Sequence, residues 1–133
     1  MPTAFVTGAG VRIGAAIARA LAQSGFDLIL HANASIERLT SHAASLASLS
    51  CSIKLVQGDL STIEGVLHIA QEVQKLTATL DLLVNNAAIY ESVPFDSISE
   101  SQYRRMMAIN LDAPFFLTQA LMPQLRSSPV ASV

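Results

Sequence analysis

The sequence predicts an α/β fold in which helices cover both faces of a parallel β-sheet. Short apolar runs alternate with amphipathic helical segments along the whole chain. The runs contain few polar residues, as is typical of strands that are buried on both faces. No repeat, low-complexity tract or linker interrupts the 133 residues, so we expect one domain over 1–133. Right-handed crossovers then make the sheet doubly wound.

Four strands are expected, and a fifth is expected to begin near the end of the sequence. The strands cover residues 3–7, 26–32, 52–59 and 80–88, and the fifth starts over 131–133. In a doubly wound sheet, ligands bind outside the carboxyl ends of the strands, near the point where strand order reverses. The residues that follow each strand are therefore the first candidates for a site.

The first two helices are predicted over 12–24 and 35–49. In the first, Ile13, Ile17 and Leu21 recur at helical spacing on one face, and Gly25 follows as a stop signal. Ser35 is the expected N-cap of the second. Its inward face is predicted to consist of Ile36, Leu39, Ala43 and Leu46.

The last two helices carry start signals of the type S-x-x-E/Q, the capping box. Ser61 and Glu64 are expected to open the third helix, and Ser99 and Gln102 to open a long helical stretch that ends near residue 125. The third helix presents a stripe of Val66, Ile69, Val73 and Leu76. Pro114 predicts a kink or break over 110–113.

Composition excludes several classes of function. Half of the residues are apolar, only 14% are charged, and the net charge is −2, so neither nucleic acid nor an anionic membrane is an expected partner. No apolar stretch approaches the ~20 residues of a membrane span. The N-terminus lacks the basic region and cleavage site of a signal peptide. The lone Cys51 cannot form an internal disulfide, which favours the cytoplasm.

The three histidines suggest no metal centre. His31, His42 and His68 show neither the spacing of metal ligands nor a pairing with a nucleophile. We expect His42 and His68 to lie on helix surfaces.

A glycine-rich turn, VTGAGVRIG over residues 6–14, joins the first strand to the first helix. Glycines at 8, 10 and 14 allow a tight turn and let a ligand approach the main chain. The helix N-terminus offers free N–H groups to a pyrophosphate. The common dinucleotide fingerprint would require glycine at position 13, where this chain has Ile13.

Polar residues follow two other strands and interrupt the last helical stretch. Asp59 precedes Leu60 after the third strand, and Asn85 and Asn86 end the fourth. Asn110 lies close to Pro114. Each of these residues alone is equally consistent with a cap or a turn.

Taken together, these motifs resemble those of the short-chain dehydrogenase/reductases. The T-G-x-x-x-G-x-G turn of that family is TGAGVRIG here, with Arg12 at the middle glycine. Its D-[VL] pair is Asp59–Leu60, its N-N-A-G is NNAA over 85–88, and its helix asparagine is Asn110 in an NL pair. The resemblance runs the length of the chain, in the order and at the spacing of the family.

The resemblance implies a Rossmann-type domain that moves hydride between a nicotinamide dinucleotide and a carbonyl or alcohol. It implies that the turn holds the pyrophosphate, that Asp59 and Leu60 flank the adenine, that residues 86–88 lie against the adenosine ribose, and that Asn110 belongs to a catalytic tetrad. The expected cofactor-binding residues are Gly8, Gly10, Arg12, Ile13, Gly14, His31, Asn33, Ser35, Asp59, Leu60, Asn86, Ala87 and Ala88.

The cofactor is expected to be NADP(H) rather than NAD(H). No carboxylate follows the second strand until Glu37, so nothing there repels a 2′-phosphate. Arg12 can pair with that phosphate, and Asn33 and Ser35 can add neutral donors. Arg12 and the HANAS stretch over 31–35 resemble pteridine reductases, whereas acyl-carrier-protein ketoreductases are the alternative subfamily.

The remaining catalytic residues of the family, a serine and a Tyr-x-x-x-Lys, have no counterpart. Tyr90 is followed four residues later by Pro94, and Tyr103 by Met107. We therefore expect the N-terminal half of such an enzyme, truncated at its C-terminal end and inactive alone. The alternatives are a shortened nucleotide-binding chain without catalysis and a module that only binds partners. The substrate, a carbonyl or a pterin, is not specified further. Uncovered apolar surface over 106–125 predicts a homo-oligomer.

Overall fold

The computed structural model describes residues 1–133 and contains one parallel sheet with strand order β3–β2–β1–β4. The strands are β1 (Thr3–Val6), β2 (Asp27–Ala32), β3 (Ile53–Gln57) and β4 (Leu82–Val84). The central strand β1 pairs with β2 on one side and with β4 on the other. Strand order thus reverses at β1, which confirms the predicted α/β fold class. The expected fifth strand is present only as a parallel bridge from Ser132 to Leu82.

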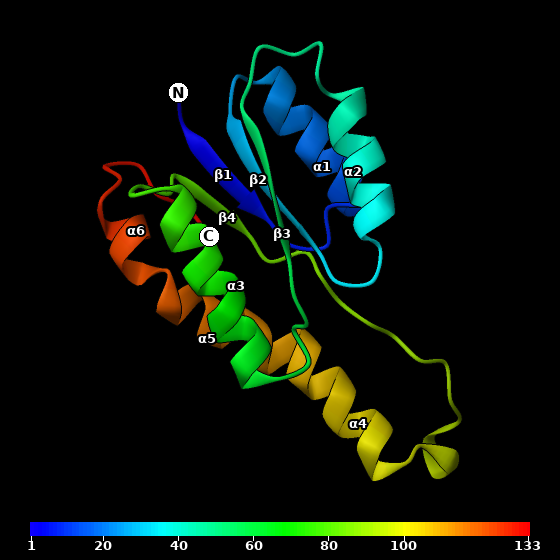
Figure 1. The fold of residues 1–133 in the computed structure, drawn as a ribbon. Helices are drawn as coiled ribbons and strands as arrows, with labels where there is room; N and C mark the ends of the chain where they lie inside the picture. Colours follow the sequence, from blue (N-terminus) through cyan, green and yellow to red (C-terminus); the bar gives the residue numbers. More distant parts are fainter.

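Helices cover both faces of this sheet (Figure 1). The helices are α1 (Arg12–Gln23), α2 (Ile36–Ser45), α3 (Ile63–Leu76), α4 (Glu100–Met107), α5 (Ala113–Ala120) and α6 (Met122–Arg126), with a 3₁₀ turn η1 (Phe95–Ser97) and a π turn η2 (Ala108–Asp112). In Figure 1, α1 and α2 lie on one face of the sheet, and α3, α5 and α6 lie on the other. The helix α4 and the loop before it extend beyond the edge of the sheet.

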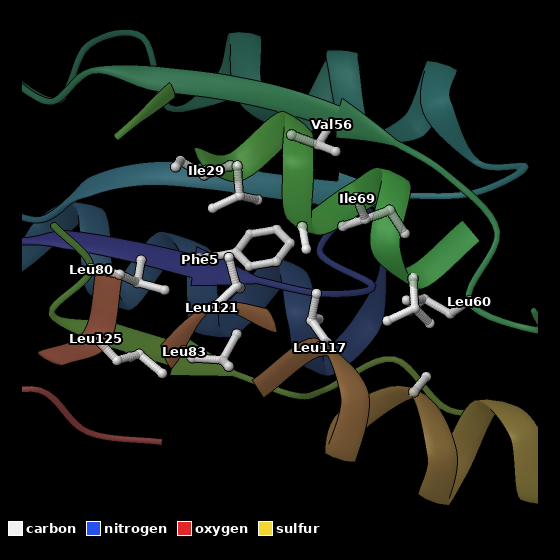
Figure 2. Close-up of a cluster of buried hydrophobic side chains, with 14 residues drawn as sticks. Phe5, Ile29, Val56, Leu60, Ile69, Leu80, Leu83, Leu117, Leu121 and Leu125 are labelled. Carbon is white, nitrogen blue, oxygen red and sulfur yellow. The ribbon is translucent and has the colours of Figure 1, made fainter. Parts of the chain in front are cut away.

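Two buried clusters lie on the two faces, because successive side chains of a strand point in opposite directions. Phe5 belongs to the larger cluster, between the sheet and α3, α5 and α6 (Figure 2). Its neighbours Ala4 and Val6 belong to the cluster beneath α1 and α2. Leu60, after β3, belongs to the first cluster, and Ala9, in the turn after β1, belongs to the second, so the loops at the carboxyl edge of the sheet are packed onto the core.

The first helix packs differently from the prediction. Its buried residues are Gly14, Ala18 and Ala22, whereas Ile17 and Leu21 are only partly buried. Ile13, expected on the inward face, is 71% exposed. The small side chains let α1 lie close to the sheet.

The third helix begins one residue later than predicted. Its N-cap is Thr62, whose Oγ1 accepts a hydrogen bond from the Gly65 N–H at 3.0 Å. The predicted box from Ser61 does not form, because the Ser61 N–H donates to Asp59 Oδ1 instead. The second predicted box is confirmed, since Ser99 and Gln102 cap each other's backbone N–H groups.

The break predicted before Pro114 is the π turn η2, which joins α4 to α5. The proline is then the second residue of α5, in its first turn, where proline is best tolerated. The wide turn contains Asn110 and brings it beside the segment that follows β4.

Ser35 is the N-cap residue of α2, as predicted, although its side chain makes no cap hydrogen bond. One smaller prediction was wrong. His42 is half-buried rather than on the surface, and its Nε2 atom is enclosed without a hydrogen-bond partner. His68 is exposed as expected. None of the helices combines the length and the apolar character that crossing a membrane requires.

Candidate functional site

A cavity of about 400 Å³ opens at the carboxyl ends of the strands. The glycine turn, the ends of β2 and β3, the segment after β4, and α4 with η2 all contribute to it. Its lining residues are Gly8, Val11, Arg12, Ile13, Gly14, His31, Asn33, Asp59, Leu60, Asn86, Ala87, Ala88, Ile89, Arg105 and Ile109. Of the predicted site residues, all but Gly10, Ser35 and Asn110 therefore lie on one surface.

Two glycines of the turn have different physical roles. Gly8 has a φ of +62°, in the left-handed region that favours glycine. Gly14 is required for close approach, because a Cβ atom there would lie 2.1 Å from the Gly8 carbonyl oxygen. The third glycine, Gly10, faces α2: a Cβ atom added to it would lie 3.3 Å from the backbone nitrogen of Leu39. Gly10 thus allows the turn to pack closely against α2, and it does not line the cavity.

Arg12 is the only non-glycine residue with a positive φ, at +50°. This conformation costs about 1–2 kcal/mol for an L-residue other than glycine. The side chain lines the cavity, is exposed, and forms no ion pair. A strained backbone therefore places an unpaired positive charge beside the N-terminus of α1, where an anion is also favoured by the helix dipole.

Thr7 anchors the turn to the end of β4. Its side chain is almost fully buried, and Oγ1 accepts hydrogen bonds from the N–H groups of Asn86 and Ala87, each at 3.0 Å. The same hydroxyl donates to the Val84 carbonyl at 3.3 Å. In return, Asn86 Nδ2 donates to the carbonyl oxygens of Thr7 and Gly8. These hydrogen bonds fix the glycine turn and the segment after β4, two walls of the cavity, relative to each other.

Thr7 was not among the predicted site residues, although it is the first letter of the turn motif. The signal was present in the sequence, since a polar residue at the end of an apolar strand needs partners when it is buried.

His31, on β2, ties the turn to the end of β3. The ring is 2% exposed, Nδ1 accepts from the Gly8 N–H at 3.3 Å, and Nε2 lies 2.9 Å from the Gly58 carbonyl oxygen. Both contacts are satisfied by the neutral tautomer with its proton on Nε2. Burial lowers the pKa of His31 below 6.5, which favours the same neutral form. Both ring nitrogens are therefore engaged within the protein.

Asp59 and Arg105 both line the cavity. Asp59 Oδ1 accepts from the Ser61 N–H at 2.8 Å. The pKa of Asp59 is lowered mainly by hydrogen bonds from Ser61 and, to a smaller extent, by the positive charge of Arg105. The nearby walls are Leu60 and Ile109, both buried.

Sequence reasoning missed Arg105 and Ile109, together with Val11 and Ile89, as cavity residues. Arg105 and Ile109 are four residues apart, the spacing that puts two helical side chains on one face. That spacing places them together, but it does not reveal which surface they face.

Asn110 lies outside the cavity and holds one of its walls. Its Oδ1 accepts from the Ile89 N–H at 2.9 Å, and its Nδ2 donates to the Ile89 carbonyl at 2.8 Å. Both backbone groups of Ile89 are thus bound by a single side chain. Asn110 also borders a separate, open hollow together with Asn85 and Phe115.

The site suits a ligand that combines anionic groups with apolar surface. It combines backbone N–H groups at a helix N-terminus, two arginines and apolar walls. No three His, Cys, Asp or Glu side chains come together in a way that could hold a metal ion.

The chain matches the model of the family described as short chain dehydrogenase over residues 2–133. Among curated proteins it is similar to galactitol 2-dehydrogenase of Agrobacterium fabrum, with 36% identity over 118 residues, which cover 89% of this chain and 44% of that protein. The chain spans about half the length of the curated relatives that it matches.

Solved structures show the same fold. The RhlG/NADP active-site complex of Pseudomonas aeruginosa matches with a TM-score of 0.87 and 31% identity, over 96% of this chain and 49% of that one. An alcohol dehydrogenase from the archaeon Thermococcus sibiricus, complexed with 5-hydroxy-NADP, matches with a TM-score of 0.88 and 30% identity, over 96% and 54% of the two chains.

Proposed function

Because the chain belongs to the short chain dehydrogenase family, we propose that it binds NADP(H) in the cavity at the carboxyl edge of its sheet. The observation that carries this proposal is Arg12, a strained and unpaired cation on the cavity wall beside the glycine turn. Relatives of known structure that bind NADP, by their own descriptions, support the same cofactor.

We place the pyrophosphate of the dinucleotide at the glycine turn of the cavity. Glycine at position 14 lets the first turn of α1 pack directly against the Gly8 carbonyl and Asn86, where a Cβ atom would clash. The proposed contacts are Gly8, Ile13 and Gly14 for the pyrophosphate side, and Asp59 and Leu60 for the adenine side. Asn86, Ala87 and Ala88, which also line the cavity, are proposed for the ribose side. Gly10 packs against Leu39 of α2, and His31 bonds to the Gly58 carbonyl. Both residues hold the turn in position.

The preference for a 2′-phosphate follows from the charges around the end of β2. Ala32 and Asn33 stand where a carboxylate would favour the free ribose hydroxyl of NAD. Arg12 offers a guanidinium fork to the phosphate, and Asn33 lines the same cavity. Ser35, half-buried ahead of α2, is proposed as a further neutral donor.

The test is a titration of the chain with NADPH and with NADH, followed by fluorescence. Wild type is expected to bind NADPH more tightly, and Arg12→Ala to reduce that preference about tenfold or more, the effect of a lost charge-assisted contact. Arg104→Ala is the matched control, because Arg104 pairs with Glu100 and does not line the cavity. An unchanged NADPH-to-NADH affinity ratio in Arg12→Ala would overturn the role of Arg12.

We further propose that the whole protein reduces a carbonyl or pterin-like substrate. When bound, NADPH supplies the hydride, and reduction then also needs a proton donor at the substrate oxygen. Neither Tyr90 nor Tyr103 has a lysine four residues later, so residues 1–133 contain no Tyr-x-x-x-Lys donor. Asn110 is proposed to act through Ile89 as a positioning residue of the catalytic side.

The absence of a Tyr-x-x-x-Lys donor favours a second candidate function for the 133-residue chain alone. In this second candidate, the chain binds the nucleotide but does not catalyse its oxidation. Loss of a positioned general acid costs about 10²–10⁴-fold in rate. We expect no measurable NADPH oxidation by residues 1–133 with a panel of ketones and pterins, and turnover by a form extended to about 250 residues, within single-domain length. Similar rates from both forms would contradict this expectation.

A further inference from the structure

The cavity contains a second arginine, Arg105, which no motif of the sequence accounts for. We propose that the Arg105 guanidinium lies against the adenine base of the bound dinucleotide and covers one face of it. This inference rests on the proposed function and assigns a specific residue to the base. Arg12 comes from the glycine turn and Arg105 from α4, so the two cations belong to different parts of the same cavity.

The position of Arg105 is the first support. It lines the cavity together with Ile109, one helical turn later, and with Asp59 and Leu60 after β3. The charge of Arg105 contributes to the lowered pKa of Asp59, after the larger effect of Ser61, so the two side chains are within electrostatic reach. This is the end of the cavity proposed for the adenine.

The second support is how Arg105 is held. Its Nη1 lies 3.4 Å from Glu91 Oε1, and Glu91 Oε2 accepts from Gln102 Nε2 at 3.0 Å. Gln102 is itself fixed by the capping box with Ser99. The carboxylate that orients Arg105 is therefore anchored to the same helix, one turn earlier.

The third support is that most of the hydrogen-bond donors of Arg105, and more than half of its side-chain surface, remain free. A single long bond to Glu91 uses one of its five donors, and its side chain is 59% exposed. A guanidinium is planar and weakly hydrated, and it stacks on aromatic rings, whereas a lysine ammonium has no plane to stack. The buried side chains of Leu60 and Ile109 add apolar surface for the same base.

The test compares NADPH and NADH affinities of wild type, Arg105→Ala, Arg105→Lys and Arg104→Ala. Arg104 is the neighbouring arginine of α4 and lies outside the cavity. Because both cofactors contain adenine, Arg105→Ala should weaken both by the same factor, about 2- to 30-fold, the range of a cation–π contact. Arg105→Lys should weaken them nearly as much, and Arg104→Ala should leave both unchanged. Circular dichroism and thermal unfolding check that each variant folds.

The outcomes separate this inference from the function on which it rests. Equal affinities of Arg105→Ala and wild type overturn the inference alone. A selective loss of NADPH affinity, or full retention in Arg105→Lys, overturns the assignment to adenine, because either result points to a phosphate contact. A wild-type chain that binds neither cofactor overturns the proposed function and this inference with it.

Discussion

Arg12 combines a strained backbone with a charge that meets no protein partner. Glycine adopts its φ of +50° at no steric cost, whereas any residue with a Cβ atom does so at a cost of about 1–2 kcal/mol. A cation at this position is therefore favoured by something other than the stability of the fold. The proposed 2′-phosphate contact supplies such a reason.

The strain at Arg12 can be measured with two substitutions that both remove the charge. Arg12→Gly should be more stable than Arg12→Ala by about 1 kcal/mol in free energy of unfolding, because only glycine relieves the backbone. Urea denaturation of the two variants gives this difference. Equal stabilities would show that residue 12 leaves the left-handed conformation once the arginine is removed.

His31 makes the stability of the fold depend on pH. Burial lowers its pKa in the folded state below 6.5, so the unfolded chain binds more protons as the pH falls past that value. The free energy of unfolding should therefore be greatest above pH 6.5 and decrease as the pH falls below it. Burial lowers the pKa of His42 as well, with a smaller effect from Arg19, and contributes in the same direction.

Two variants separate the histidines. His31→Asn, which does not titrate, should show a smaller loss of stability between pH 7 and pH 5 than wild type, and His42→Gln should retain the contribution of His31. Denaturation at a series of pH values measures both. Asp59 and Asp81, whose pKa values are lowered by hydrogen bonds from Ser61 and Ser128, affect stability only as the pH falls below about 4.

Single residues show how far prediction from the sequence extends. Gly8, Gly14 and Arg12 could be assigned to the cavity because the turn is local and its glycines report its geometry. The cavity position of Arg105 could not be predicted, since it depends on where the loop before α4 directs that helix. The roles of Thr7 and His31 depend on partners distant in sequence.

At the scale of elements, the π turn η2 serves to present Asn110 to the segment after β4. Its side chain holds both backbone groups of Ile89, and Ile89 lines the cavity. A regular helix would rotate this side chain differently relative to α5. The break before Pro114 thus couples the last helical stretch to a cavity wall.

Asn110→Ala should loosen that wall without unfolding the protein. Each hydrogen bond contributes about 0.5–1.5 kcal/mol, and Asn110 is exposed enough for water to replace it. We expect faster hydrogen exchange at the Ile89 amide and little change at Phe5, in the centre of the sheet. Asn110→Asp, which keeps the acceptor for that amide, should show a smaller effect. Equal exchange in wild type and Asn110→Ala would contradict the coupling.

The elements themselves were largely predictable, because hydrophobic periodicity is a local signal. The strands and α-helices of the first hundred residues were expected near their observed positions, although β4 covers only Leu82–Val84 of the predicted 80–88 and the 3₁₀ turn η1 was not predicted. The start of α3 was not, since Ser61 and Thr62 are both good caps and Asp59 takes the Ser61 N–H. Ile13 is exposed because α1 packs closely on the sheet through its small residues. The helical spacing of Ile13, Ile17 and Leu21 could not predict this packing.

At the scale of the whole molecule, α4, η2 and α5 present apolar side chains that the rest of the chain leaves uncovered. Phe115 is 62% exposed and Leu111 is 56% exposed, and Tyr103 on α4 is also exposed. Monomeric proteins seldom leave large neighbouring apolar side chains in water. The expected consequence is self-association, which stays a prediction.

Phe115→Asp should weaken this association. Analytical ultracentrifugation at micromolar concentration is expected to show dimers or larger species for wild type and a shift toward monomer for the variant. Phe95→Asp is the matched control, because Phe95 is 96% exposed on η1 and lies outside α5. A wild-type chain that sediments as a monomer would contradict the prediction.

The hydrogen bonds of Thr7 also determine when, during synthesis and folding, the glycine turn can reach its final structure. The Thr7 hydroxyl accepts from amides 79 and 80 residues later in the chain. At ribosomal speeds of roughly 5–20 residues per second, the turn waits about 4–16 seconds for these partners to be made. Contacts between such distant segments also form slowly during refolding. The glycine turn, among the first residues synthesised, is therefore expected to be among the last parts of the molecule to become rigid.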